Sequence, residues 1–247
     1  MKQITSEFDR FYYNAEIKNS RTGTHFFPSV THILDSAPVP QQLVKWWKNL
    51  GHYSTDFMNH ASDIGSLVHH CCEEMVKSKF GWSGEKIMEY FYETYGYKLS
   101  ESDLIFTKRC LMGFMAWNAE MKEKYGKGFK ILKSEYQTCS DDYAGTIDLL
   151  IEIDEKKITV DLKTSKAIRD NHERQVESYR RSDGADLGAT LRLGAERAGL
   201  SNYSFDIVKT ASKQNKLWAE FQAIKEVFYL TAKAEPTTEE FAELFKL

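Results

Sequence analysis

The chain has 247 residues, of which 42% are hydrophobic and only four are proline, a composition that predicts a packed globular fold without long disordered segments. Its net charge of −3 is not that of a generally basic nucleic-acid binder, although a local basic groove is enough to attract phosphates. No apolar run approaches the roughly 20 residues of a membrane span, and the polar start Met1-Lys2-Gln3 is not that of a signal peptide. We therefore expect a cytoplasmic protein with no membrane partner.

The first half of the chain is predicted to be largely helical. A β-hairpin comes first, around the turn-forming residues 19–23, and apolar residues then recur at helical spacing. The expected hairpin strands are Phe8–Ile17 and Thr24–Phe27, and the expected helices are Thr31–Leu34, Gln41–Leu50, Asp56–Lys79, Glu85–Tyr95 and Ser102–Tyr125.

The second half is predicted to alternate strands with helices. The expected strands are Lys130–Gln137, Ile147–Ile153, Ile158–Leu162, Ala189–Leu193 and Tyr203–Lys209. The expected helices are Asn171–Arg181, Lys213–Lys233 and a short last helix that begins at the capping box Thr237–Glu240. Because no repeat or linker divides the chain, we predict one α/β domain over residues 1–247. Its hairpin and helices, 1–129, would wrap a mixed sheet formed by 130–247.

The second and third of these strands have the pattern of an antiparallel hairpin. A two-residue turn centred on Glu155-Lys156 would set Leu149 opposite Leu162 and make one face of the pair entirely apolar. A slip by one residue would bring charged side chains onto that face, so the pattern favours this register. The opposite face then carries three charged residues, with the lysine opposite the first aspartate: Asp148, Asp161 and Lys163.

Two carboxylates and an ammonium on one rigid face are compatible with two kinds of structure. Carboxylate oxygens are ligands that Mg²⁺ prefers, and a neighbouring lysine can orient a water or neutralise a phosphate. The alternative is a cross-strand ion pair on a solvated sheet face, which would contribute only about 0.2–1 kcal/mol.

Neighbouring residues favour the chemical interpretation. Gly145-Thr146 precedes Asp148 and allows close approach of backbone or ligand. Gln175 and Tyr179 are four residues apart on a predicted helix, so they share a face. His69 lies at the edge of the apolar stripe of the predicted helix Asp56–Lys79, with Glu73 one turn later.

Together these residues resemble the RecB-type branch of the PD-(D/E)XK nuclease family, and within it phage exonucleases and the mitochondrial genome maintenance exonuclease. The matching elements run in order along the chain: Pro28-Ser29-Val30-Thr31, Gly65-x-x-x-His69, Gly145-Thr146-Ile147-Asp148, Asp161-Leu162-Lys163-Thr164-Ser165 and Gln175-x-x-x-Tyr179. Ile147 stands where the family's name would put proline, a position that is not a ligand. The resemblance implies a restriction-endonuclease-like fold, a mixed central sheet flanked by helices.

The resemblance also implies the chemistry of the site. His69, Asp148 and Asp161 would bind one or two Mg²⁺ or Mn²⁺ ions, and Lys163 would assist the attacking water in a metal-dependent DNA exonuclease. Gln175 and Tyr179 would support this catalytic group, and Glu73 and Glu135 are additional candidate ligands at its edge. Some relatives carry an iron–sulfur cluster on one early and three late cysteines. This chain has no cysteine after Cys139, so we expect no cluster.

The expected substrate is DNA with free ends, with single strands preferred, in phage or organellar-type replication or recombination. Candidate contacts to the strand are hydroxyls and a lysine near the motifs, and two tryptophans interleaved with basic residues: Ser29, Thr31, Thr164, Ser165, Lys166, Trp46 and Trp47. The tryptophans could equally be core anchors of a short helix. Two alternatives for the whole protein stay open, a structure-specific endonuclease on the same fold and a non-catalytic DNA-binding or assembly protein. Partners among recombination or replication proteins are compatible with each.

Overall fold

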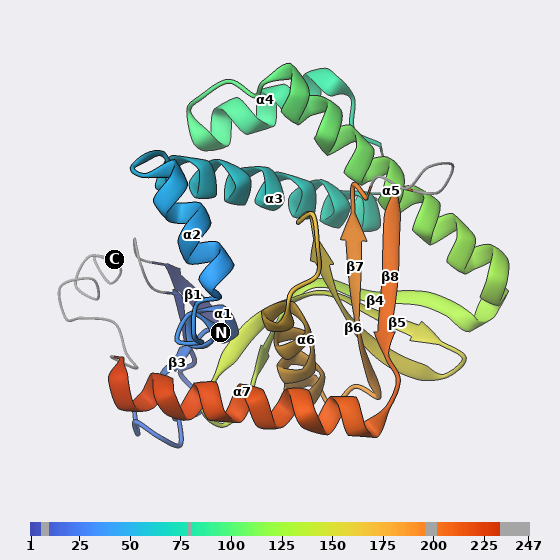
Figure 1. Ribbon diagram of the computed structural model, residues 1–247. Helices are drawn as coiled ribbons and strands as arrows, with labels where there is room; N and C mark the ends of the chain where they lie inside the picture. Colours follow the sequence, from blue (N-terminus) through green and yellow to red (C-terminus); the bar gives the residue numbers. More distant parts are fainter. Residues whose placement is uncertain (6–9, 79–80, 196–201, 233–247) are drawn as a thin grey trace.

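The computed structural model describes residues 1–5, 10–78, 81–195 and 202–232 (Figure 1). A small antiparallel sheet begins the chain, with strands β1 (Lys2–Thr5), β2 (Arg10–Tyr13) and β3 (Phe26–Pro28) in that order. The β2–β3 pair is the predicted hairpin with shorter strands. Its connecting loop is held by Asn19, whose side chain donates a hydrogen bond to the carbonyl of Phe26 at 2.9 Å.

Helices follow in the order that the apolar spacing predicts. Ser29, Ser83 and Ser100 cap three of them by accepting hydrogen bonds from backbone N–H groups of the first turn. The helices are α1 (Val30–Leu34), α2 (Gln41–Leu50), α3 (Tyr53–Ser78), α4 (Gly84–Tyr95), α5 (Glu101–Tyr125), α6 (Asp170–Asp183) and α7 (Ala211–Thr231), with a 3₁₀ turn η1 at Gly126–Gly128. The capping box expected at Thr237–Glu240 lies outside the described residues, as do the expected ends at Phe8, Lys79 and Lys233.

The main sheet is mixed, as predicted. Its strands lie in chain order: β4 (Phe129–Cys139), β5 (Ala144–Ile153), β6 (Lys156–Lys163), β7 (Leu187–Leu193) and β8 (Tyr203–Val208). Neighbouring strands are antiparallel except β6 and β7, which are parallel and are connected through α6. The carboxyl ends of β6 and β7 therefore meet at the same edge of the sheet.

The predicted register of the β5–β6 hairpin is wrong by two residues. Leu149 pairs with Val160 instead of Leu162, because the two turn residues are Asp154 and Glu155, one position earlier than expected. Both have positive φ, 48° and 68°, as a turn that matches the twist of the strands requires, and aspartate tolerates that conformation well. A shift of two keeps every side chain on its predicted face.

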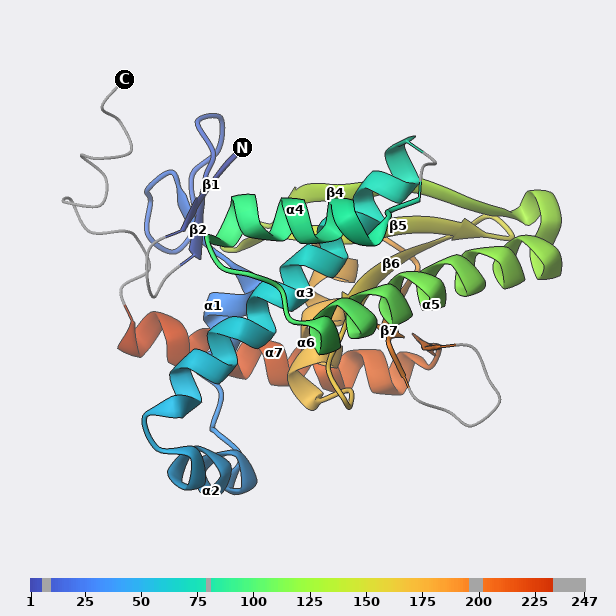
Figure 2. The same ribbon diagram turned by 90° about the horizontal axis from the view of Figure 1, so that it is seen from above.

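Two apolar cores lie on the two faces of the main sheet (Figures 1 and 2). Helices α3, α4 and α5 pack on one face, where β5, β6 and β7 contribute alternate apolar residues. Helices α1, α6 and α7 enclose the smaller core on the other face, around Tyr143, Ile147 and Phe221. The larger core combines residues from both sides of position 129, which supports the single domain 1–247, a division that stays a prediction. Among the described residues, no helix has the length and apolar character needed to span a membrane.

Candidate nuclease site

Strands β5 and β6 place two buried aspartates next to each other. Asp148 lies on β5 and Asp161 on β6, with exposed fractions of 9% and 3%. Oδ2 of Asp148 accepts a hydrogen bond from the backbone N–H of Leu162 at 2.5 Å, which fixes this carboxylate against β6. With the corrected register, Asp148 comes level with Asp161, and the predicted placement of Lys163 directly opposite Asp148 is wrong.

A row of hydrogen bonds connects Asp161 with α6. Nζ of Lys163 donates to Oδ1 of Asp161 at 2.9 Å and to Oε1 of Gln175 at 3.1 Å. Nε2 of Gln175 donates in turn to the Tyr179 hydroxyl at 3.1 Å. The two α6 residues thus point the same way, as their spacing predicts, and they hold the ammonium of Lys163 beside Asp161.

A second group of ligand atoms forms where α3 crosses the sheet. Nδ1 of His69 lies 3.2 Å from Oδ1 of Asp148 and 3.9 Å from Oε1 of Glu135. The potential metal-ligating atoms of these three residues all lie within 4.8 Å of one another. One imidazole nitrogen and two carboxylates suit a divalent first-row ion or Mg²⁺ completed by water and substrate oxygens, so the donor set fits the expected metal.

Glu135 enters this group through an irregularity of β4. Its φ of 43° is rare for a residue other than glycine, and its neighbours Ser134 and Tyr136 both keep their pairing with β5. Such a conformation at a cluster of charged groups is typical of residues held in place for function. Only the general position of Glu135, at the edge of the site, was predicted from the sequence.

The charges of this site are strongly coupled. Burial raises the pKa of Glu135 to about 8, and the nearby carboxylate of Asp148 adds to this effect. Burial also raises the pKa of Asp161 to about 6, against the opposing influence of Lys163. For Asp148 the cost of burial is outweighed by His69 and Lys163, so its pKa is lowered, and the pKa of His69 is raised despite its burial. A cation between these groups would relieve the repulsion among the three carboxylates.

Two glycines allow the elements of the site to approach closely. A Cβ atom at Gly145 would lie 2.4 Å from Cε1 of Tyr179, so only glycine lets β5 pass beneath this ring. At Gly65, one helical turn before His69, a Cβ atom would lie 3.5 Å from Oγ1 of Thr164. Helix α3 therefore lies against the loop that follows Lys163.

Several predicted residues lie outside this arrangement. The carboxylate of Glu73 pairs with Lys77 on α3. Ser29 is 2% exposed, and its hydroxyl accepts a hydrogen bond from the backbone N–H of His32, so Ser29 serves as the N-cap of α1. The hydroxyl of Ser165 donates to the carbonyl of Ala167 at 2.8 Å. Thr31 and Lys166 are exposed, and Thr164 is half-buried.

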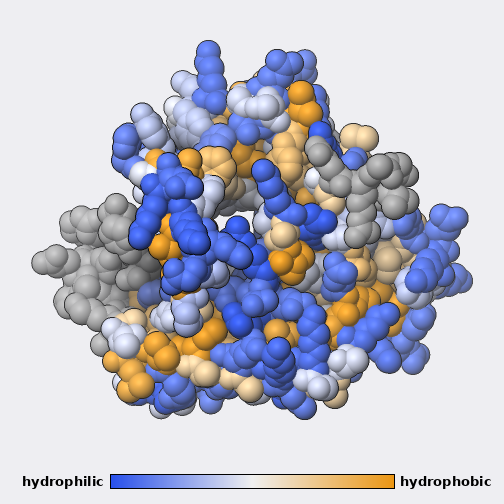
Figure 3. Space-filling model, in the orientation of Figure 1, coloured by the Kyte–Doolittle hydropathy of each residue, from blue (hydrophilic) through white to orange (hydrophobic). Residues whose placement is uncertain are grey.

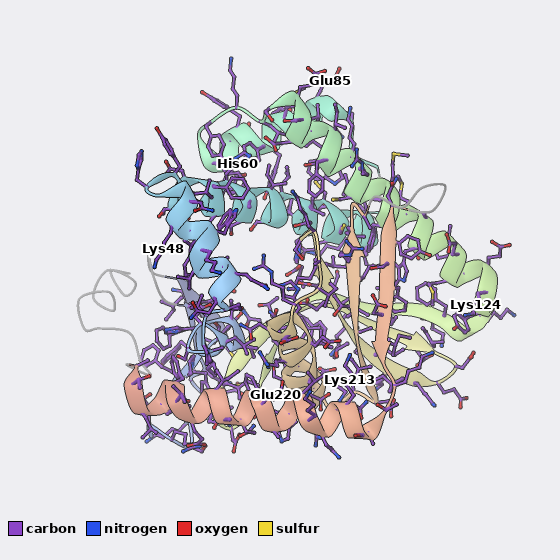
Figure 4. The ribbon with its side chains drawn as sticks, in the orientation of Figure 1. Lys48, His60, Glu85, Lys124, Lys213 and Glu220 are labelled. Atoms are coloured by element: carbon purple, nitrogen blue, oxygen red, sulfur yellow. The ribbon has the colours of Figure 1, made fainter. Side chains whose placement is uncertain are left out.

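Helix α2 carries the two predicted tryptophans. Both are half-buried, and the ring of Trp46 packs edge-on against Phe57 of α3 with centroids 5.4 Å apart. None of the ten residues of α2 is buried, so the tryptophans are not anchors of the main cores. Figure 4 shows Lys48 on the side of α2 that faces away from α6.

Tyr12 is a neighbour of the site that sequence reasoning missed. Its hydroxyl lies 3.0 Å from Oγ1 of Thr146, two residues before Asp148 on β5. Tyr12 is 1% exposed, and burial raises its pKa. The contact spans 134 residues and joins the small sheet to the main sheet. No local pattern in the sequence signals such a long-range contact.

Comparison with known families identifies this arrangement. Residues 88–201 match the PD-(D/E)XK nuclease superfamily. The matched segment excludes His69 but contains the other residues of the site: Glu135, Asp148, Asp161, Lys163, Gln175 and Tyr179. This segment of the chain is similar to a PD-(D/E)XK nuclease domain. Its mixed sheet flanked by helices is the restriction-endonuclease-like arrangement of that superfamily, whose members are nucleases that use divalent metals.

Likeness to individual proteins is weaker. The sequence matches no curated protein. The match to the crystal structure of SSO0001 covers 70% of this chain and 86% of that chain, with 13% identity and a TM-score of 0.29. A phage related exonuclease from Haemophilus somnus 129PT covers 58% of this chain and 78% of its own, with 12% identity and a TM-score of 0.28. At such TM-scores neither likeness supports an argument about this chain.

Proposed function

We propose that this protein is a divalent-metal-dependent DNA exonuclease that prefers single strands or free ends. The observation that carries the proposal is the position of two groups of residues at the paired strands β5 and β6, which the hydrogen bond from the backbone N–H of Leu162 to Asp148 holds together. The ligand group of His69, Glu135 and Asp148 lies beside the row formed by Lys163, Asp161 and Gln175. Metal-assisted hydrolysis of a phosphodiester uses a cation that stabilises charge on the phosphate, together with groups that position the attacking water.

Each residue has a role that follows from its contacts. Asp148, Asp161 and His69 would hold the metal, and Glu135 would contribute a further carboxylate. A bound Mg²⁺ or Mn²⁺ supplies charge stabilisation for the phosphate and lowers the pKa of a coordinated water. Nζ of Lys163 is a hydrogen-bond donor to both the carboxylate of Asp161 and the amide oxygen of Gln175. Charge stabilisation at the phosphate is therefore its proposed role, rather than general-base catalysis.

The preferred ion follows from the donor set. Imidazole suits first-row transition ions better than Mg²⁺, and His69 lies at the centre of the ligand group. We expect Mn²⁺ to support activity at least as well as Mg²⁺.

The preference for single strands or ends is supported by the surface around the site. Figure 3 shows that the molecule is hollowed near the centre of this face, between α2, α3 and α6, and that hydrophilic side chains border the hollow. Trp46 and Trp47 lie on α2, the helix beside this hollow, and their half-buried rings are the proposed stacking partners for unpaired bases. Thr31, Thr164 and Lys166 are accessible for contacts to the strand's phosphates. We assign no such contact to Ser29, since its hydroxyl caps α1.

A covalently closed single-stranded circle tests the proposed reaction against its rivals. We expect the protein to degrade a linear strand with Mn²⁺ and to leave a circle of the same sequence intact. Rapid opening of the circle would favour the structure-specific endonuclease. Tight binding of both DNAs without cleavage of either would favour the non-catalytic DNA-binding or assembly protein. Partners in recombination or replication, in a phage or an organelle, would fit an exonuclease of this kind.

A further inference from the structure

Arg192 lies next to Lys163 at the edge where β6 and β7 end. The two residues are partners in the parallel pairing of these strands, which run about 4.8 Å apart. Gly188 faces α6, since a Cβ atom there would lie 2.4 Å from Cγ1 of Val176. Side chains alternate along a strand, so Arg192 projects to the same α6 side as Gly188.

The guanidinium of Arg192 holds the loop that follows Lys163 by a hydrogen bond to its backbone. Nη1 donates to the backbone carbonyl of Lys166 at 2.7 Å, and Nε donates to Oγ of Ser204 at 3.4 Å. Ser204 is the partner of Arg192 on β8, so β8 orients the guanidinium while the guanidinium holds the loop. These two bonds use only two of the five N–H donors of an arginine.

Residues of the loop itself, 164–169, make two further hydrogen bonds. Ser165 bonds to the carbonyl of Ala167, and the backbone N–H of Arg169 donates to Nδ1 of His172 at 3.3 Å. Burial, Lys163 and Arg169 together lower the pKa of His172 to about 4, so this ring is neutral and can accept that bond.

The loop presents positive charge to solvent. Lys166 and Arg169 are both exposed. Of the acidic residues in the first turn of α6, Glu173 pairs with Lys213, whereas Asp170 is 84% exposed and lies 3.9 Å from Arg174. Two exposed cations on a loop held by these hydrogen bonds, directly after Lys163, are suited to a phosphate of the nucleic-acid backbone.

We propose that loop 164–169 binds a backbone phosphate adjacent to the scissile one, and that Arg192 is the positioning residue that holds this loop in its binding conformation. The inference rests on the proposed nuclease function, because it concerns how the strand is placed on Lys163 and Asp161. Arg192 acts through the carbonyl of Lys166, and its fork of donors is what a lysine at this position lacks.

Salt-dependent binding of a fluorescent single-stranded oligonucleotide in EDTA tests the loop separately from cleavage. We expect Lys166→Ala to reduce the slope of log K against log salt by about 0.7, the value for one lost contact to a single strand. Arg192→Ala should reduce this slope by at least as much. In a separate cleavage assay with Mn²⁺, Arg192→Ala should raise KM more than it lowers kcat. Arg192→Lys keeps the charge but not the fork, so we expect it to restore the slope only in part. Lys124→Ala, at the distant end of α5 (Figure 4), should leave the slope unchanged.

Three outcomes decide between the two proposals. The first outcome is that the wild type cleaves DNA but Lys166→Ala and Arg192→Ala have the same slope as Lys124→Ala. This result would overturn the loop inference alone. If Arg192→Lys restores the full wild-type slope, the positioning role of Arg192 is overturned. A positive charge without the several N–H donors of a guanidinium would then be sufficient for binding. The expected slopes in a wild type that never cleaves DNA would support the loop and overturn the nuclease function. Because Lys166→Ala leaves the backbone carbonyl in place, it tests the loop even where Arg192→Ala fails to fold.

Discussion

Glu135 is the residue of the site whose carboxyl group most resists losing its proton in the folded protein without metal. Its carboxyl is held near Asp148 and largely removed from water, and its pKa is raised to about 8 from an ordinary value near 4.5. In the metal-free protein the folded state therefore binds one more proton than the unfolded state between these pH values. Stability consequently falls as pH rises through that window.

This coupling predicts how pH and metal act together on stability. Without metal, wild type should lose stability between about pH 4.5 and pH 8, and Glu135→Gln should lose less because it carries no proton to release. Mn²⁺ should raise the melting temperature more at pH 8 than at pH 5.5, because its ligands must be deprotonated. Thermal denaturation with and without Mn²⁺ measures both effects. An identical pH dependence in Glu135→Gln and wild type would contradict the placement of Glu135.

Tyr179 and Asp161 should differ sharply in their contribution to the reaction. The Tyr179 hydroxyl reaches Lys163 only through Gln175, whereas Asp161 touches Lys163 directly and is a proposed ligand. We expect Asp161→Ala to lower kcat by at least about a thousandfold, roughly 4 kcal/mol, and Tyr179→Phe to lower it by about tenfold or less. Single-turnover rates at saturating Mn²⁺ measure the difference. The reverse order would contradict these roles.

At this scale, residue types were easier to predict than their contacts. Asp148, Asp161, Lys163 and Gln175 could be grouped because strand and helix periodicity assigns each side chain to a face. The approach of Glu135 to His69, by contrast, involves a residue of β4 with an irregular φ. No periodicity in the sequence encodes such an irregularity.

Among the elements, the packing of β5 against α6 makes a specific demand at Gly145. Gly145→Ala would force the Tyr179 ring to move, because the new Cβ atom would lie 2.4 Å from it. We expect a loss of about 1–3 kcal/mol in the free energy of unfolding, together with reduced activity. Gly65→Ala is the matched control, since its Cβ atom would make an ordinary 3.5 Å contact and alanine favours the helix. Chemical denaturation compares the two, and equal effects would contradict the close approach at Gly145.

Helices of this protein are predicted well because apolar residues at a spacing of 3.6 and serine caps are local signals. Hairpin register is not, because it depends on which two turn residues adopt positive φ. Moving the turn from Glu155-Lys156 to Asp154-Glu155 changed every partner on β6. The predicted faces nevertheless held, since the period of a strand is two. The face with both aspartates and Lys163 was therefore correct even though the pairs were not.

For the whole molecule, contacts between residues that are far apart in the sequence are the features that the sequence does not predict. A mixed sheet could be expected, but only the structure shows that β6 and β7 are parallel and bring Lys163 beside Arg192. Likewise, the alternation of residues along the strands does not show that Tyr12 lies against Thr146, because the two residues are 134 positions apart in the sequence. The position of α2 beside the central hollow is another feature of this kind (Figures 1 and 3).

The most direct test of the account is a timed digestion of end-labelled linear DNA by wild type and Asp161→Ala, in Mn²⁺, Mg²⁺ or EDTA. The account predicts degradation of single-stranded DNA by wild type in Mn²⁺, comparable or slower degradation in Mg²⁺, and none in EDTA. Asp161→Ala, folded by circular dichroism, should be inactive in all three. Equal activity in EDTA and in Mg²⁺, or full activity of Asp161→Ala, would contradict the metal-dependent nuclease site.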